Sequence, residues 1–356
     1  MPEINPANRH ELDYHDEAAR LAKLNFPIVD VHTHVNGSDA VKVYSQVAKA
    51  FGIGLTYSMT YLENMEPVRS ILGKSVRFIA MPRFSEEERY YKSVGAYMKH
   101  VEAYYLKGAR ILKLWAAPRG IDIGKASGCP DLFKLSSPRR IEIINEACGM
   151  NMVLMTHVGD PDTWFKTMYQ DCATYGEKVD QYKPLEELLA EYTVPWIAAH
   201  MGGWPEDLEF LSGLLARHPN LYLDTSATKW MVRELSRHSR QDLIRFLTEW
   251  RERILFGSDI TVKDEDLLLK GTPNSAASLE AAFELYASRY WSLRTLFESD
   301  YSGESPISDP DLAQLEPQRY SPFDAPLLQG KALPAEIIHE LYYGAAARLL
   351  DGYYVA

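Results

Sequence analysis

Eight short apolar runs, rich in β-branched or aromatic residues, recur along the 356-residue chain, and a stretch with helical character follows each of them. Alternating strands and helices predict a parallel sheet that is covered by helices on both faces. A count of eight favours a closed (β/α)8 TIM barrel, which typically takes about 250 residues. An open doubly wound sheet is the alternative, but no glycine-rich phosphate loop follows the first run. The runs are residues 27–32, 53–59, 76–81, 109–115, 152–157, 194–200, 220–225 and 254–259.

The intervening stretches predict helices, and the whole chain, 1–356, is expected to form a single domain. The barrel takes approximately residues 27–299, an irregular segment rich in Pro, Asp and Ser follows at 300–333, and 334–350 predicts a closing helix with proline in its first turn. Helices are predicted at 40–51, 86–106, 138–148, 184–192, 206–218 and 240–250.

Composition and charge narrow the class of partner. The formal net charge of −11 disfavours nucleic acid and anionic membranes, because both select basic surfaces. The polar N-terminus has no signal pattern, and no apolar stretch approaches the roughly 20 residues of a membrane span. Three cysteines in no metal-binding spacing indicate free thiols. We therefore expect a cytoplasmic protein that acts on a small molecule, with homo-oligomerisation left open.

Two histidines stand one residue apart, at the end of the first apolar run. Side chains alternate along a strand, so His32 and His34 point the same way, as ligands of a divalent metal must. Asp30 lies on the same side and could orient a ligand, or it could be a buried carboxylate of the barrel wall.

Three further polar residues end later runs. His157 ends the fifth run, His200 the sixth and Asp259 the eighth. The carboxyl ends of barrel strands form the face on which such enzymes build active sites, so these residues and the histidine pair are expected to converge there. The sequence therefore predicts a metal-dependent enzyme.

With these motifs in place, the chain resembles the amidohydrolase superfamily, and in particular its amidohydrolase family 2, or amidohydrolase-related, branch. The similarity covers nearly the whole chain, and its specificity comes from the order and spacing of the motifs. They are PIVDVHTH, ARILKLW, MTHVGDP, IAAHMGG, LYLDTSA, ILFGSD and YYGAAARLL.

The resemblance implies a ligand set and a cofactor. His32, His34, His157 and Asp259 are the implied metal ligands, with His200 beside the metal as a catalytic or substrate-polarising imidazole. Zinc is the first expectation for one divalent ion, since imidazoles and a carboxylate suit it, while manganese, iron and cobalt remain open. Asp259 would also accept a proton from the attacking water and return it to the leaving group.

Lys113 on the fourth strand raises the question of a second metal. Binuclear members of the superfamily carry a carboxylated lysine at this place, whereas in family 2 such lysines occur without bridging. We expect a mononuclear site; for a second metal, or for substrate, the residues to consider are Lys113 and His200.

Other residues near predicted strand ends are candidates for contacts with substrate. An arginine there would suit a carboxylate of the substrate. The candidates are Arg83, Trp115, Arg119, Trp164, Trp204 and Lys229.

Three hypotheses of function follow. The leading one is a hydrolase that cleaves a C–N or C–O bond, as in an amide or lactone, of a small and possibly carboxylated molecule. The alternative is a metal-dependent nonoxidative decarboxylase of an aromatic or unsaturated carboxylic acid, which would use the same ligands. The third is a noncatalytic barrel that serves as a binding protein. This hypothesis does not explain why the chain carries the full ligand set.

Overall fold

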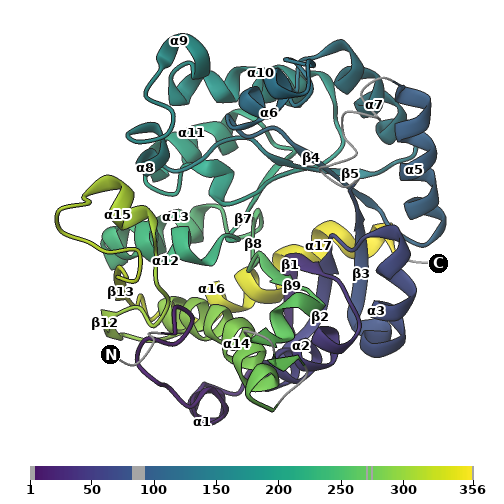
Figure 1. The fold of residues 1–356 in the computed structure, drawn as a ribbon. Helices are drawn as coiled ribbons and strands as arrows, with labels where there is room; N and C mark the ends of the chain where they lie inside the picture. The colour runs from purple at the N-terminus through teal and green to yellow at the C-terminus, as the bar shows by residue number, and fades with distance from the viewer. Residues whose placement is uncertain (1–4, 82–92, 270–271, 274–275, 355–356) are drawn as a thin grey trace. The chain divides into compact units, whose positions relative to one another are not determined.

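The structure is a computed structural model, and it describes residues 5–81, 93–269, 272–273 and 276–354. Strands and helices alternate along the chain as in a (β/α)8 barrel, and Figure 1 labels these elements. All eight predicted strands are present, and helices follow them in the expected alternation, so the predicted fold class is confirmed. The strands are β1 (Ile28–Val35), β2 (Ile53–Ser58), β3 (Val76–Ala80), β4 (Ile111–Trp115), β5 (Val153–His157), β6 (Trp196–Ala198), β7 (Leu221–Asp224) and β8 (Ile254–Leu255).

The predicted helices also appear, within a few residues of their expected bounds. For the range 86–106 the structure describes the helix from residue 94, and residues 86–92 lie outside the described residues. The helices are α2 (Asp39–Ala50), α5 (Val94–Leu106), α7 (Pro138–Gly149), α10 (Lys183–Glu191), α11 (Leu208–Arg217) and α13 (Arg240–Glu249).

Local sequence signals explain where several of these helices begin. The side chain of Ser93 accepts a hydrogen bond from the amide of Ala96 at the start of α5. Asp207 and Ser239 cap α11 and α13 in the same way, and Ser137 caps α7, whose first residue is a proline. Such caps satisfy amides that the first helical turn leaves without a partner.

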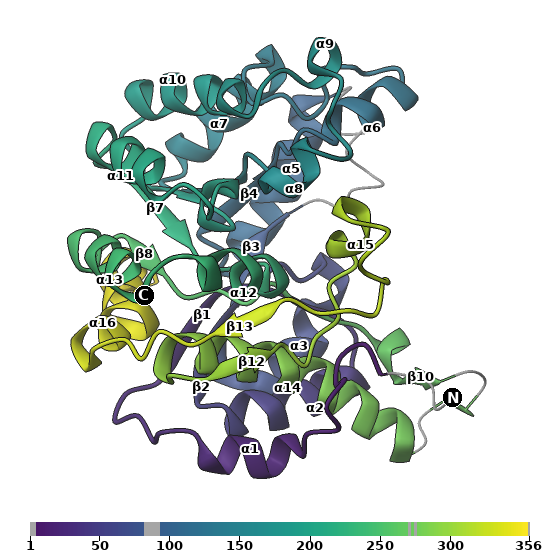
Figure 2. The ribbon, with the colours of Figure 1, turned by 90° about the vertical axis from the view of Figure 1, so that its left-hand side faces the viewer.

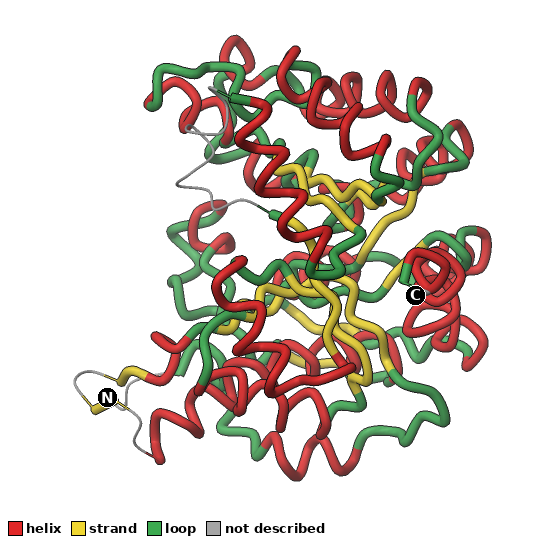
Figure 3. Tube along the Cα trace, turned by 90° about the vertical axis from the view of Figure 1, so that its right-hand side faces the viewer, coloured by secondary structure: helices red, strands yellow, loops and turns green. Residues whose placement is uncertain are grey.

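The chain forms two compact units. The first comprises Met1–Ser58, Glu63–Arg77 and Thr225–Leu349, and the second comprises Met59–Leu62, Phe78–Asp224 and Leu350–Ala356. The expectation of a single domain over 1–356 stays a prediction. Each unit is described separately, and in each the strands are flanked by helices (Figure 3).

In the first unit, β1 is the central strand. It pairs in parallel with β2 and with β9 (Ile260–Val262), which follows β8. The amide of Val31 also donates a 2.9 Å hydrogen bond to the carbonyl of Phe256, just after β8. The last barrel strand therefore lies beside the first, as the closure of a barrel requires.

Long helices cover the strands of the first unit. Helix α14 (Ala276–Glu298) packs against α2 and α12 (Thr228–Arg237), and Figure 1 shows α2 and α14 side by side. Tyr286, Tyr290 and Leu293 are fully buried on α14. The closing helix runs from α16 (Ala335–His339) through a π-helical turn (Glu340–Gly344) into α17 (Ala345–Leu350).

The segment 300–333 was expected to be irregular, and it contains short regular elements. Its strands β12 (Ser302–Glu304) and β13 (Leu327–Gln329) pair antiparallel, and α15 (Asp311–Leu315) lies between them in the chain. Strand β13 contacts α12 and α14 (Figure 2). The segment is thus attached to helices of the first unit.

The second unit contains most of β3 and all of β4 to β7. These strands pair in parallel in chain order, with Leu112 opposite Leu154, Leu154 opposite Trp196, and Trp196 opposite Leu221. All four side chains are fully buried. Burial on both faces of the sheet explains the near-continuous apolar strands.

Shorter elements complete the described chain. None of the helices within the described ranges combines the length and the apolar character that a bilayer crossing needs. The remaining helices and strands are α1 (Tyr14–Arg20), α3 (Met65–Leu72), α6 (Gly120–Ala126), α8 (Asp162–Phe165), α9 (Cys172–Tyr175), β10 (Leu268–Leu269) and β11 (Thr272–Pro273).

Candidate active site

The first unit brings together three of the predicted ligands. His32 and His34 project from the same side of β1, and Asp259 follows β8. The Nε2 atoms of His32 and His34 lie 3.5 Å and 3.3 Å from the same oxygen, Oδ1 of Asp259. The His32 side chain is 1% exposed, while those of His34 and Asp259 are 27% and 30% exposed. His32 therefore lies at the buried end of the cluster, while His34 and Asp259 are accessible to solvent.

The backbone of Asp259 has an uncommon conformation. Its φ angle is +60°, in the left-handed region, where a residue other than glycine costs on the order of 1–3 kcal/mol. Its amide donates a 2.8 Å hydrogen bond to the carbonyl of His32, which holds the strained turn against β1. Nearby, a Cβ at Gly257 would lie 3.0 Å from Cβ of His32, so glycine allows this close approach of the two segments.

Ser226 contacts the second ring nitrogen of the His32 imidazole. Its Oγ lies 3.1 Å from Nδ1 of His32, and both residues are buried. A hydrogen bond at Nδ1 fixes the ring orientation and directs Nε2 toward Asp259. Metal-binding histidines commonly have such a partner at the second ring nitrogen.

Asp30 joins the two segments that carry the ligands. Its Oδ1 accepts hydrogen bonds from the main-chain amides of His32 and Ser258, both at 3.1 Å. Its Oδ2 accepts from the hydroxyls of Ser258 at 2.5 Å and Tyr290 at 2.9 Å. Burial raises the pKa of Asp30 to about 7, although these hydrogen bonds act in the opposite direction. Asp30 is thus a buried carboxylate of the wall that also holds the backbone next to two predicted ligands, His32 and Asp259.

The distances from Asp259 to the two histidines fit ligands of a divalent metal. Two ligands that are each about 2.0–2.1 Å from a tetrahedral zinc lie about 3.3–3.4 Å apart. The separations of 3.3 Å and 3.5 Å between the imidazole nitrogens and Oδ1 of Asp259 match that edge length. Two imidazoles and one carboxylate are also a common donor set for zinc.

The second unit brings together His157 and His200. Their ring centroids lie 4.6 Å apart, with the ring planes nearly perpendicular at 76°. His157 is the last residue of β5, and His200 stands two residues beyond β6 with a φ angle of +59°. The amide of His200 donates a 2.9 Å hydrogen bond to Asp224 at the end of β7, which fixes this turn.

A buried chain of hydrogen bonds orients His157. Its Nε2 lies 2.8 Å from Oδ1 of Asp160, and Oδ2 of Asp160 accepts a 2.8 Å hydrogen bond from the hydroxyl of Tyr169. Asp160 and Tyr169 are each 1% exposed. A carboxylate in this position favours one tautomer of His157, with a proton on Nε2 and the lone pair on Nδ1.

Sequence reasoning did not single out Ser226, Asp160 or Tyr169. Ser226 follows β7 by two residues, and Asp160 follows His157 by three, so their places after strand ends were the available signal. Tyr169 is separated from His157 by a loop and a short helix, and no periodic pattern connects the two.

Three of the predicted substrate contacts in the second unit are tryptophans that pack against other aromatic rings. The ring of Trp115 lies edge-on to His157, with centroids 6.0 Å apart. Trp164 packs edge-on against Tyr169, and Trp204 stacks on Tyr182. Arg119 begins α6.

Three further candidates complete the predicted set. Lys113 is 4% exposed and pairs with Met155 in the sheet. Burial lowers the pKa of Lys229 in the first unit, and Arg289 adds to this effect, although Asp309 and Asp311 oppose it. Arg83 lies outside the described residues.

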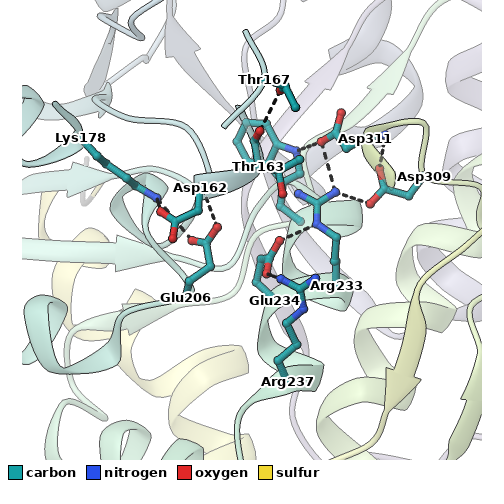
Figure 4. A network of polar contacts seen from close by, with 11 residues as sticks. Asp162, Thr163, Thr167, Lys178, Glu206, Arg233, Glu234, Arg237, Asp309 and Asp311 are labelled. Atoms are coloured by element: carbon teal, nitrogen blue, oxygen red, sulfur yellow. Dashed lines mark hydrogen bonds and ion pairs between the residues drawn. The ribbon is translucent and has the colours of Figure 1, made fainter. Parts of the chain in front are cut away.

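Two clusters of ion pairs connect loops and helices, one in each unit (Figure 4). In the first unit, Arg233 of α12 contacts Glu234 at 2.5 Å, Asp311 at 3.2 Å and also Asp309, so α12 is tied to the 300–333 segment. In the second unit, Nζ of Lys178 lies 2.7 Å from Asp162 and 4.7 Å from the centre of the Trp204 ring. Lys178 therefore connects Asp162, which follows β5, with Trp204, which follows β6.

Comparison with known proteins identifies a family model that matches most of the chain. The model is described as Amidohydrolase and matches residues 37–352, a range that includes His157, His200 and Asp259 and begins after the histidine pair of β1. A search of curated proteins gives no match.

Several solved structures are similar to this chain at 12% sequence identity. One is an amidohydrolase from Burkholderia multivorans with bound HEPES, which matches over 93% of this chain and 100% of its own with a TM-score of 0.45. Another is an apo structure from Agrobacterium tumefaciens, at 74% of this chain, 91% of its own and a TM-score of 0.40. The Burkholderia multivorans amidohydrolase with bound zinc covers 93% and 100%, with a TM-score of 0.38.

Proposed function

The chain belongs to the amidohydrolase family, and we propose on this premise that it is a metal-dependent hydrolase of C–N or C–O bonds in a small organic molecule. Amides and lactones are the substrate classes that this proposal names. Family membership supports an enzyme of the hydrolase type, and the geometry of the first unit supports dependence on a metal.

One observation carries the proposal. Two imidazole nitrogens lie 3.5 Å and 3.3 Å from one carboxylate oxygen, and each distance is close to the separation of two ligands of a tetrahedral zinc. In this proposal His32, His34 and Asp259 hold one divalent ion. His157 is a further ligand, as the resemblance implies for the residue that ends the fifth strand. Zinc is the proposed ion.

In this proposal, Asp259 transfers protons and His200 polarises the substrate, beside a bound divalent ion. When bound, a divalent ion supplies a Lewis acid that lowers the pKa of water from 15.7 to about 7. Asp259 accepts the proton of the attacking water and returns it to the leaving nitrogen or oxygen. His200 polarises the carbonyl that is attacked.

The surrounding residues position these groups and the substrate. Ser226 and Asp30 hold the ligands of the first unit, and Asp160 holds His157. The proposed contacts to substrate are Trp115, Arg119, Trp164, Trp204 and Lys229, of which the two cations suit a carboxylate on the substrate.

The test is a screen of amides and lactones with metal-free and zinc-loaded protein in ¹⁸O-labelled water. We expect hydrolysis only after zinc is restored, with one labelled oxygen in the acid product. Undiminished turnover by the metal-free protein would contradict the proposal. Release of carbon dioxide from aromatic or unsaturated acids, without incorporation of the label, would support nonoxidative decarboxylation instead.

A further inference from the structure

A cavity of about 310 Å³ lies in the second unit, beside His157. Its walls come from two stretches of chain, residues 116–136 after β4 and residues 175–184 around the start of α10, together with Val158. Val158 directly follows His157, and the amide of Ala116 donates a 2.9 Å hydrogen bond to the carbonyl of His157. The cavity wall therefore begins at the backbone of the candidate ligand.

The interior of this cavity is mostly apolar. Ala117, Phe133, Leu135 and Val158 line it, and each is at most 4% exposed. Phe133 meets the ring of Trp115 edge-on, with centroids 5.0 Å apart, and Trp115 in turn contacts His157. Aromatic contacts therefore link the lining of the cavity to the imidazole.

Three polar side chains of the lining, those of Tyr175, Asp180 and Gln181, form hydrogen bonds or ion pairs with neighbouring groups. Asp180 pairs with Lys183 at 2.6 Å, and it accepts a hydrogen bond from the amide of Glu177. The Tyr175 hydroxyl donates to Asp122, and the Gln181 amide donates to the carbonyl of Tyr175. Lys134 is exposed. The lining therefore suits an uncharged ligand, since burial of a charge without a partner is costly.

We propose that this cavity binds an uncharged aromatic or alicyclic ring, and that the ring is part of the substrate attacked beside His157. An apolar cavity of about 150 Å³ already accepts benzene, so 310 Å³ has room for one substituted ring. The second half of this inference rests on the proposed function, because it takes His157 as a metal ligand. The first half concerns the cavity alone.

The first experiment titrates metal-free protein with 4-fluorobenzyl alcohol and follows the ¹⁹F signal by NMR. We expect saturable binding that weakens at least tenfold in Ser136→Phe, which places a ring at the exposed edge of the lining, and in Ala117→Leu, which fills the interior. Ala126→Phe is the control, because Ala126 is exposed on α6 and does not line the cavity. Equal affinities in all four proteins, or no saturable binding, would overturn the inference.

The second experiment adds Mn²⁺ to the complex with the same probe. Paramagnetic broadening of the bound ¹⁹F signal is expected if the ring lies beside the metal, and His157→Ala should reduce it. Tight Mn²⁺ binding without broadening would overturn the placement of the ring in the substrate. Failure to bind Mn²⁺ would contradict the proposed function and the substrate role together, while the first titration still decides whether the cavity binds a ring.

Discussion

The amide of Asp259 donates a 2.8 Å hydrogen bond to the carbonyl of His32, and the carboxylate of Asp259 lies 3.5 Å from the imidazole of the same histidine. Main chain and side chain therefore join the end of the last barrel strand to the first. The strained φ angle of Asp259 is held by this contact, so the ligand cluster is arranged by the fold before any ion binds.

Asp259→Asn should lower zinc affinity by more than about 100-fold, since even the loss of an outer partner commonly costs about 10–100-fold. The asparagine side chain is an uncharged and weaker ligand for a metal than the carboxylate, and the cluster loses its negative charge. Competition against a chromophoric chelator measures the change. Asp16→Asn, at an exposed carboxylate of α1, should leave the affinity unaltered. Equal affinities of the Asp259 variant and the parent protein would remove the carboxylate from the ligand set.

Ser226→Ala should weaken zinc binding by about 10-fold or more, because His32 then loses the hydrogen bond at Nδ1 that orients its ring. The matched control is Ser292→Ala. Ser292 is also buried, and its hydroxyl has no hydrogen-bond partner within the described part of the chain. If both serine variants change zinc affinity alike, Ser226 acts through packing and the positioning role fails.

Tyr169→Phe should alter the tautomer of His157 without unfolding the protein. The hydroxyl holds Asp160 at 2.8 Å, and Asp160 contacts the imidazole. Without it, the carboxylate is less fixed, and the ¹⁵N NMR signals of His157 should report a mixture of tautomers. Tyr175→Phe removes a hydroxyl that binds Asp122 at an exposed site and should leave these signals unchanged. An unaltered His157 spectrum in Tyr169→Phe would contradict the relay.

Arg233→Met should lower the free energy of unfolding by about 3–5 kcal/mol, because it leaves buried carboxylates without their counter-charge. Arg237→Met, on the same helix, removes a side chain that is 58% exposed and should cost about 0–1 kcal/mol. Urea unfolding measures both. A cost below 1 kcal/mol for Arg233→Met would show that the contacts between α12 and residues 309–311 contribute little.

Much of the fold could be predicted from the sequence because barrel strands are buried on both faces. Runs such as Val153 to Met155 and Trp196 to Ala199 are apolar without interruption, and helix caps such as Ser137 mark the next element. The 300–333 segment was harder, because its short strands are fixed by tertiary contacts with α12 and α14 and not by local periodicity.

For the candidate site, the predicted ligands could be read from the sequence, but the turns and hydrogen-bond partners that position them could not. His32 and His34 follow from the period of two along β1, and Asp259 follows from its place after β8. The left-handed turns at His200 and Asp259 were not predictable, since neither residue is a glycine. The partners Ser226, Asp160 and Tyr169 depend on contacts between loops, which a sequence pattern does not record.

The most direct test of the central claim is a crystal structure of the zinc-loaded protein with anomalous data collected at the zinc edge. The account predicts one strong peak at about 2.0–2.2 Å from Nε2 of His32, Nε2 of His34 and a carboxylate oxygen of Asp259. Zinc-loaded crystals with no peak beside these three residues, or with zinc only at other side chains, would contradict it.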